Sequence, residues 1–369
     1  MKKFFLCFLI LSLTVSGTLF AQVVDYIPPK LDGEHEDIDD INAELAKLFD
    51  DLAHEIREEL GVMITSPEKL IGAFANSSVF ASAGATQRGY AGYRALAVSA
   101  GPMLGFQLPV SPTDFIKDVD GAMDNLFTDS DVALGANVQL MNAQIGINLS
   151  RFLLNGLYVG AKVGFMNLPI EDYNFSTLSV GGMVNYQLLR RFSLPLRFIQ
   201  WRGINIGTWL IYQTTTLDFD YPLETELEGG SETIEVMGHV VSVDTEANMH
   251  MKFNIRTYTI PVEVMTSIRL LWFLNLAVGA GVDIGFGSAS LNVGGSMVTH
   301  FTELPEDMEQ ERPGTVSINM GGSAGPTAIN PKIMAGVGFT LGPLFLDFPL
   351  TYYPSDNGYN FGVTVGVVF

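Results

Sequence analysis

The side chains of this sequence that could do acid–base or metal chemistry are scattered. No histidine stands at metal-ligand spacing from another histidine or a cysteine. A Gly-Gly-Ser sequence at 321–323 lacks the Lys-Ser/Thr that completes a phosphate-binding loop. The sequence therefore predicts no catalytic residues, no cofactor and no metal site, and the protein is not expected to be an enzyme. The histidines are His35, His54, His239, His250 and His300.

A second set of reactive side chains consists of charges within otherwise apolar strands. Lys162, for example, stands between Ala161 and Val163, so in a strand it points away from the apolar face. Facing lipid it would cost about 2 to 4 kcal/mol near the midplane. We expect these charges to face a polar lumen, as a permeation path or as structural pairs that hold a barrel shut. The predicted lumen-facing residues are Lys162, Arg256, Glu263, Asp283, Lys332 and Asp347.

The segments that carry these charges alternate between apolar and small or polar residues. The clearest is Trp272–Phe286, where eight even positions are apolar and Asn275, Asp283 and glycines hold odd ones. Mean hydropathy is +0.26 despite a net charge of −20, and after Ala21 no segment is continuously apolar. This pattern predicts an all-β fold, a transmembrane antiparallel β-barrel of 10–14 strands. At Met141-Asn142 the apolar parity changes, which indicates a turn or a bulge.

The connections between these segments alternate in length. Asn155-Gly156 is interpreted as a two-residue hairpin turn, and Gly342-Pro343 is also short. Residues 214–252 and 287–331 are interpreted as long acidic loops, and extra strands are possible within 287–331. Short turns at one rim and long loops at the other are typical of outer-membrane barrels. With the C-terminus taken as periplasmic, both long loops are expected outside the cell.

The last twelve residues, from Gly358 to Phe369, alternate up to a terminal aromatic residue. This ending resembles the C-terminal recognition strand of bacterial outer-membrane barrels. The resemblance implies that the barrel-assembly machinery is a partner. A strand of a soluble β-sandwich is the alternative interpretation, and a folded form that requires detergent would exclude it. The residues of this assembly signal are Phe361, Val363, Val365, Val367 and Phe369.

The N-terminus has the pattern of a secretory signal peptide. Two lysines precede an apolar run from Phe4 to Leu13, and a stretch of small residues ends at Ala21. The sole cysteine, Cys7, would leave with this peptide, so no disulfide is expected. Together with the barrel pattern, the signal peptide predicts that the protein is located in the bacterial outer membrane.

An amphipathic helix is predicted to follow. Apolar residues recur at spacings of three and four from Ile38 to Leu60, Asp37 can be the N-cap, and Gly61 can end the helix. Its polar face is acidic. We expect it to plug the barrel or to cap it from the periplasm, and a coiled-coil partner is the weaker alternative. The small residues of 72–93 that follow suit either the inside of a lumen or a first strand with a glycine-rich loop.

This order of parts resembles the FadL family of outer-membrane channels for long-chain fatty acids, with residues 74–93 similar to the small-residue segment of its hatch. The resemblance implies a 14-stranded barrel plugged by an N-terminal hatch, and a hydrophobic small molecule as ligand. It divides the chain into a signal peptide (1–21), an N-terminal helical and hatch-like segment (22–93) and a barrel (94–369).

The expected function is therefore a channel or transporter for the uptake of hydrophobic or small molecules. The alternatives are a structural or adhesive surface protein with a closed lumen and, less favoured, an outer-membrane hydrolase that uses His239, His250 or His300. The lipid of the outer membrane is an expected partner. The net charge of −20 argues against nucleic acid.

Overall fold

The computed structural model describes residues 18–34, 37–63, 67–84, 95–108, 135–150, 152–170, 173–193, 198–223, 232–236, 239–304 and 308–369. The predicted signal peptide up to residue 17, and residues 85–93 of the hatch-like stretch, lie outside this part. Among the described residues, the helices are α2 (Ile38–Met63) and α3 (Pro67–Ala83). Neither described helix is long and apolar enough to cross a membrane.

Strands make up most of the described chain, and nearly all of them belong to one antiparallel sheet. In order they are β1 (Thr18–Ile27), β2 (Lys30–Gly33), β3 (Leu96–Gln107), β4 (Gly135–Asn148), β5 (Leu157–Ile170), β6 (Tyr173–Leu189), β7 (Phe192–Ser193), β8 (Ile199–Leu223), β9 (Glu232–Val236), β10 (His239–Leu270), β11 (Leu274–Glu303), β12 (Met308–Arg312), β13 (Gly314–Ala324), β14 (Ile329–Leu341), β15 (Leu344–Tyr353), β16 (Gly358–Gly362) and β17 (Thr364–Val368).

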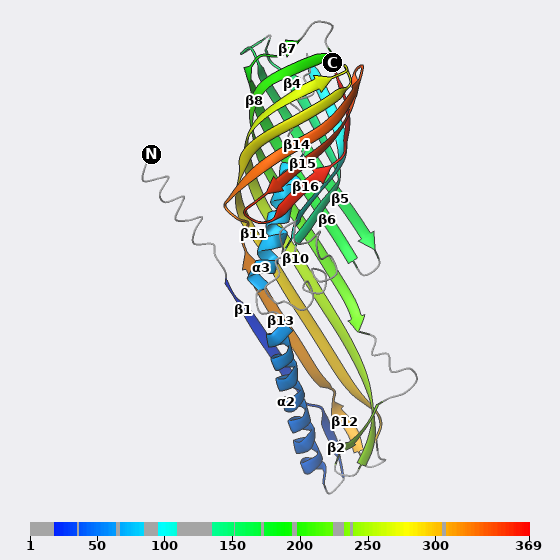
Figure 1. Cartoon of the computed structure of the whole chain (residues 1–369). Coiled ribbons are helices and arrows are strands. Elements are labelled where there is room, and N and C mark those ends of the chain that lie inside the picture. The colour runs from blue at the N-terminus through cyan, green and yellow to red at the C-terminus, as the bar shows by residue number, and fades with distance from the viewer. Residues whose placement is uncertain are drawn as a thin grey trace, which may run out of the picture.

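Ten of the described strands close into a ring, with β16 and β17 counted as one strand interrupted at Val363. The ring runs β3-β4-β5-β6-β8-β10-β11-β14-β15-β16/β17 and returns to β3. Figure 1 shows the ring as the upper part of the molecule, with the C-terminus at its far rim. The fold is that of an outer-membrane β-barrel, and its strand number is the lower end of the expected range.

Side chains on the ring strands alternate as predicted. On β14, Ile333, Val337 and Leu341 are exposed on the outer face, while Lys332 and Met334 are buried on the inner face. The C-terminal strand follows the same rule, and its exposed residues Phe361, Val365 and Phe369 are apolar. A ring that is apolar outside and polar inside fits a hydrocarbon environment, because it places every backbone group in a ladder and every charge away from lipid.

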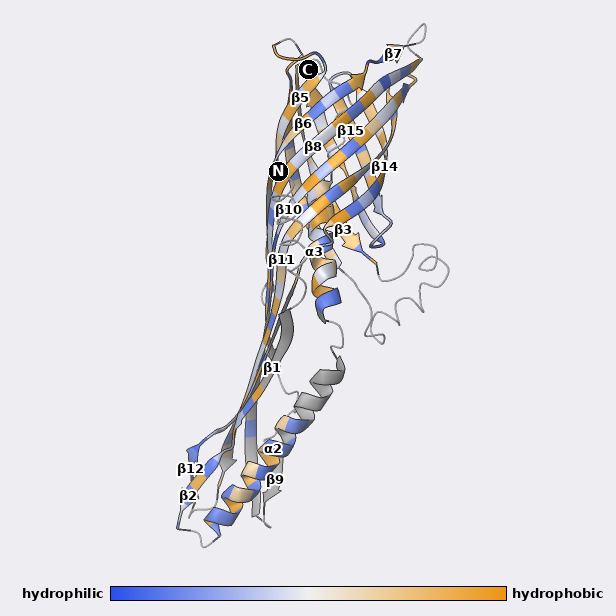
Figure 2. Cartoon of the chain, turned by 90° about the vertical axis from the view of Figure 1, so that its left-hand side faces the viewer, coloured by the Kyte–Doolittle hydropathy of each residue, from blue (hydrophilic) through white to orange (hydrophobic). Residues whose placement is uncertain are grey.

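The two segments interpreted as long loops are largely strands, so the loop interpretation is wrong, and the extra strands that were possible within 287–331 are present. Strand β11 pairs with β14 only from Leu274 to Ile284, and beyond the ring it pairs with β13 and β10 as far as Glu303. At about 3.3 Å per residue this continuation is roughly 60 Å long. We call the part of the molecule beyond the ring the arm (Figures 1 and 2). The arm consists of this continuation of β11, the parts of β8 and β10 that also extend beyond the ring, strands β1, β2, β9, β12 and β13, and helix α2.

Helix α2 lies in the arm and not in the ring. Its Leu45 packs with Leu31 and Met308, and its Phe49 packs with Val24 and Val316. The prediction of an amphipathic helix after Asp37 is confirmed, and the helix continues two residues past Gly61 to Met63. Its expected position as a plug in the lumen is wrong, because its apolar face covers the strands of the arm. The alternative, a cap on the barrel from the periplasm, stays a prediction that depends on which rim faces the periplasm.

Two local predictions are also decided. The parity change at Met141-Asn142 is a bulge, since β4 continues through it while Leu140 and Met141 both face outward. Asn155-Gly156 is not a two-residue turn. It ends a longer connection, which begins after Asn148 and includes a hydrogen bond from the Leu149 amide to the Leu157 carbonyl. Gly156 still has the positive φ of 88° that favours glycine there.

Replacing Phe49 with alanine should loosen the arm without opening the ring. The substitution removes a buried aromatic side chain from the contact between α2 and β1/β13, which costs about 3 to 5 kcal/mol in a core. Hydrogen exchange of β1 and β13 should rise, while the folded band in unheated gels stays. The matched control is Glu44→Ala on the exposed face of α2. Equal protection of β1 and β13 in the two variants would show that Phe49 does not hold the arm together.

Candidate functional site in the barrel lumen

The small-residue stretch that follows α2 forms helix α3, and α3 lies inside the ring (Figures 1 and 2). It contacts β3, β4, β8, β10, β11 and β16, which surround it on several sides. Its Ala, Ser and Val side chains and Phe80 are buried all around the helix. A helix enclosed in this way needs no apolar stripe, so its sequence shows no amphipathic period. The segment that fills the lumen is therefore α3. Of the two interpretations of the small-residue stretch, a lumen segment and a first strand, the structure shows the lumen segment for the described residues.

Glycines in the ring wall let α3 approach closely. A Cβ at Gly105 would overlap the backbone of Ser77 and Ala81, and a Cβ at Gly358 would overlap the ring of Phe80. The Phe80 ring in turn stacks on Tyr353, with centroids 3.9 Å apart. Helix and wall thus meet with almost no intervening side chain, which leaves little room for solvent along these contacts.

Polar contacts fix α3 near its middle. The Asn76 amide donates to Gln107 Oε1 at 3.0 Å and to Thr327 Oγ1 at 3.1 Å, and the Thr327 backbone amide donates to Asn76 Oδ1 at 2.7 Å. All donors and the acceptor of this amide therefore have partners on the ring or on the segment before β14. Each such bond contributes about 1 kcal/mol and fixes the position of the helix along the barrel axis.

Lys162 holds the C-terminal end of α3. Its ammonium donates to the carbonyl oxygens of Ser82 and of Gly84, the latter at 3.1 Å, and lies 5.3 Å from the centroid of the Trp209 ring. A cation at a helix C-terminus interacts favourably with the helix dipole, and the carbonyls it contacts have no partner within the helix. The predicted lumen-facing lysine is therefore the residue that ties the enclosed helix to the wall.

Beside it a charge cluster joins three neighbouring strands. Lys332 of β14 contacts Glu263 Oε1 of β10 at 2.5 Å and Asp283 Oδ1 of β11 at 2.6 Å. Tyr353 donates to Asp283 Oδ2 at 2.8 Å. Lys332 can reach across β11 because the residue between it and Glu263 is Gly281, which has no side chain. The cluster is buried and acts as a cross-link over three strands.

Amides and hydroxyls fill a further part of the lumen. Gln213 donates to Asn137 Oδ1 and to Thr177 Oγ1, and it accepts a hydrogen bond from Gln139 at 3.1 Å. These side chains are buried. A barrel of this size has an interior narrow enough for such networks and one helix to occupy much of it.

The structure places five of the six predicted lumen residues on the buried face. Lys162, Glu263, Asp283, Lys332 and Asp347 are buried, and the first four lie in or beside the charge cluster.

The prediction for Arg256 is wrong, because its side chain is exposed on the face it shares with Tyr258 and Val262. The sequence numbering already indicates this orientation. Arg256, Tyr258 and Val262 are at even positions of one strand, whereas the inward-facing Glu263 is at an odd position.

The histidines named for a hydrolase do not form a common site in the described part of the chain. His250 lies opposite Gly294 and His300 opposite Asp244, so several rungs of the ladder separate them. The side chain of His239 lies outside the described residues. The sequence analysis did not identify Asn76 and Tyr353 as lumen residues. The signal that could have identified them is a polar side chain within a stretch of small or apolar residues that suits a closed interior.

The profile of one protein family, described as Lsa36-like, matches residues 18–369. This chain belongs to the Lsa36-like family. No curated protein sequence matches this Lsa36-like chain significantly.

Among solved structures, the translocator domain of the autotransporter NalP from Neisseria meningitidis is 9% identical, over 75% of this Lsa36-like chain and 90% of that chain, with a TM-score of 0.30. The toluene transporter TbuX of Ralstonia pickettii is 11% identical over 76% and 90%, with a TM-score of 0.26. A FadL homologue of Pseudomonas aeruginosa is 7% identical over 82% and 98%, with a TM-score of 0.24.

Replacing Lys332 with methionine should destabilise the barrel by about 3 to 5 kcal/mol, because Glu263 and Asp283 would then be buried without their cation. The temperature at which the folded gel band disappears should fall. The triple change Lys332→Met, Glu263→Gln, Asp283→Asn should recover most of the loss. Lys252→Met, which removes an exposed pair in the arm, is the matched control and should change stability by less than about 1 kcal/mol. A single mutant as heat-resistant as this control would show that the cluster does not cross-link the strands.

Proposed function

We propose that the protein is a surface protein anchored in the outer membrane by a barrel with a closed lumen, and that its arm makes contacts outside the cell. The observation that carries the proposal is α3, which lies inside the ring and is bonded to the wall through Asn76 and Lys162. A structural or adhesive role needs the barrel only as an anchor, and a packed interior serves an anchor well.

The direction of the arm supports the same function. The arm leaves the rim opposite the C-terminus (Figure 1). If the terminal Phe369 faces the periplasm, as its resemblance to the assembly signal implies, α2 and the ends of β10 and β11 lie outside the cell. The assembly machinery would then recognise the C-terminal strand, and lipid would contact the apolar outer face of the ring.

The charge of the arm indicates the kind of surface that it would meet. The face of α2 that points away from its sheet exposes a series of carboxylates. Their mutual repulsion favours a partner with positive charge and makes association sensitive to salt. The exposed acidic residues of this face include Asp39, Asp40, Glu44, Asp50 and Asp51.

The uptake of hydrophobic or small molecules remains the second candidate. The FadL-like order of parts favours it, since an N-terminal segment does lie in the lumen. Transport through the lumen would require α3 to move, which breaks its bonds to Gln107, Thr327 and Lys162. The closed anchor and the transporter therefore differ in whether α3 moves out of the lumen.

The refolded protein in a planar lipid bilayer should show no conductance steps, because α3 and the charge cluster occupy the lumen. Deleting residues 67–84 should produce steps if the rest of the ring still closes. A tethered variant separates the two functions: Ser82 Oγ and Thr259 Oγ1 are 3.4 Å apart, so Ser82→Cys with Thr259→Cys should form a disulfide between helix and wall.

The same double-cysteine protein under reducing conditions is the matched control. If the wild-type protein conducts and the oxidised tether stops it, the protein is a channel gated by α3, and the closed-anchor proposal is wrong. Conductance that the tether leaves unchanged would also overturn the proposal, since another open path would then exist.

Single cysteines should report the direction of the arm, because Cys7 is the only natural cysteine. Glu44→Cys on α2 should react with a membrane-impermeant maleimide on intact cells. Leu153→Cys, 73% exposed in the turn before β5 at the other rim, should react only after the outer membrane is permeabilised. The reverse labelling would place the arm in the periplasm and remove the surface role.

A further inference from the structure

Outside the lumen, the arm carries a compact group of four ionisable side chains on its outer face. Asp218 and Asp220 stand two residues apart on β8, and His250 and Lys252 stand two apart on β10. The strand register places His250 opposite Asp220 and Lys252 opposite Asp218. The intervening Phe219 and Met251 point to the other face, where Met251 packs toward Ile71 and Phe253. Two paired strands therefore hold the four polar side chains on one surface, away from α3.

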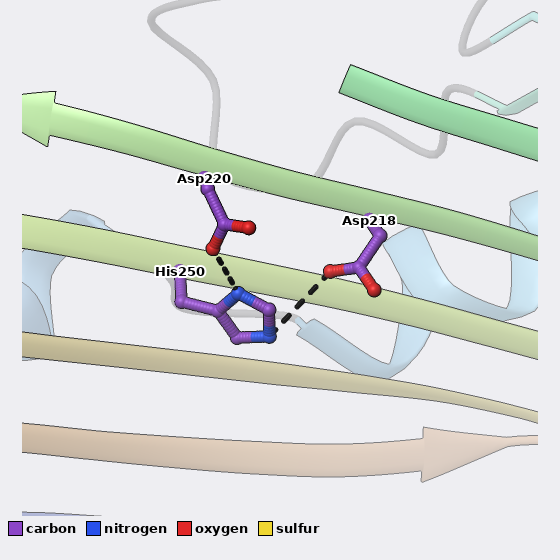
Figure 3. Close-up of side chains that lie close together, drawn as sticks. All are labelled: Asp218, Asp220 and His250. Carbon is purple, nitrogen blue, oxygen red and sulfur yellow. Dashed lines mark hydrogen bonds and ion pairs between the residues drawn. The ribbon is translucent and has the colours of Figure 1, made fainter. Parts of the chain in front are cut away.

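Both nitrogens of the imidazole face a carboxylate (Figure 3). Nδ1 of His250 contacts Asp220 Oδ1, and Nε2 lies 3.5 Å from Asp218 Oδ1. The other oxygen of Asp218, Oδ2, is 3.1 Å from the Lys252 ammonium. The two carboxylates therefore lie differently about the imidazole. Asp220 makes a direct hydrogen bond to it, whereas Asp218 lies farther from it.

The short contact determines where the proton of a neutral imidazole lies. A carboxylate that accepts from Nδ1–H fixes the tautomer in which Nε2 carries a lone pair. That lone pair then faces Asp218 Oδ1, which is shielded from solvent and accepts no hydrogen bond from the part of the chain that the structure describes. In this tautomer two electron-rich atoms face each other, an arrangement that a cation between them stabilises.

The gap has the size that a transition metal requires. Zn²⁺ binds histidine nitrogen and carboxylate oxygen at about 2.0 to 2.2 Å, so in a tetrahedral site two ligand atoms are about 3.3 to 3.5 Å apart. The observed separation of Nε2 and Oδ1 is 3.5 Å. We propose that Asp218 and His250 bind a divalent transition metal such as Zn²⁺, with Asp220 orienting the imidazole through Nδ1.

The exposure of the cluster shows what completes the coordination. His250 and Asp220 have side chains 47% and 76% exposed, so water can supply the remaining ligands. The nearby charge of Lys252 repels a metal ion, although it also keeps Asp218 in place. The arrangement is that of an open site of moderate affinity. This inference does not depend on whether the lumen transports anything, because the cluster lies on the arm.

The same contacts would also arise if His250 were a protonated imidazolium that donates to both carboxylates. The two arrangements differ in their response to Lys252. Removing this cation should strengthen metal binding, because it removes repulsion. It should have no such effect if the cluster only pairs a cationic histidine with two carboxylates.

The test measures Zn²⁺ binding to the tag-free mature chain, refolded in detergent, by competition with a chromophoric zinc chelator. His250→Ala and Asp218→Asn should each remove the binding of one Zn²⁺. Asp220→Asn should weaken it about 10- to 100-fold, as expected for a side chain that orients a metal-bound histidine. Lys252→Met should tighten it roughly three- to tenfold.

His300→Ala is the matched control, because His300 is also exposed on the arm and lies opposite a carboxylate, Asp244. It should bind Zn²⁺ like the wild-type protein. The folded gel band of each variant shows that an effect is not a loss of fold. Binding that persists in His250→Ala, or that Lys252→Met fails to strengthen, would overturn the proposal and leave a protonated, doubly paired histidine.

Discussion

The requirement that no backbone amide or carbonyl be left unpaired in hydrocarbon governs this molecule. A strand can satisfy it only between two neighbours, so the ring has to close, and the closing pair joins the C-terminal strand to β3. Phe369 takes part through its own backbone, since its amide donates to the Leu96 carbonyl and its carbonyl accepts from the Ala95 amide. Once the ring is closed at this small size, its interior is narrow, and whatever lies there must satisfy its polar groups with the wall.

The same requirement explains why side-chain parity could be predicted well from the sequence. Where a strand separates lipid from a packed interior, a one-residue shift would put a charge into hydrocarbon, so the alternation has to be strict. Lys162, Lys332 and Glu263 were found in this way and are buried. Arg256 is the exception, since its charged side chain lies on the exposed face that it shares with Tyr258.

The helices were harder to predict, for a physical reason. Helix α2 covers one sheet and therefore shows an apolar stripe, whereas α3 is surrounded and shows none. Where an element lies in the fold depends on partners distant in sequence, and α2 is placed by β1, β2, β12 and β13. The arm strands escaped prediction because, away from lipid, polar residues are allowed on either face. The cluster of Asp218 and His250 depends on the register of two strands, which no spacing along the chain reveals.

The pairing of β1 with β13 bears on the order in which the molecule is assembled. Asp25 and Ser317 are partners separated by 292 residues, so the first strand of the arm has no neighbour until most of the chain has been made. Helix α3 likewise precedes every strand of the ring that encloses it. The N-terminal segment must therefore remain unpaired while the sheet forms. The last strand pairing, between β16/β17 and β3, then either closes around a helix that is already in place, or forms first, so that the helix enters the lumen from the arm side. Contacts so distant in sequence make slow folding the natural expectation for this barrel.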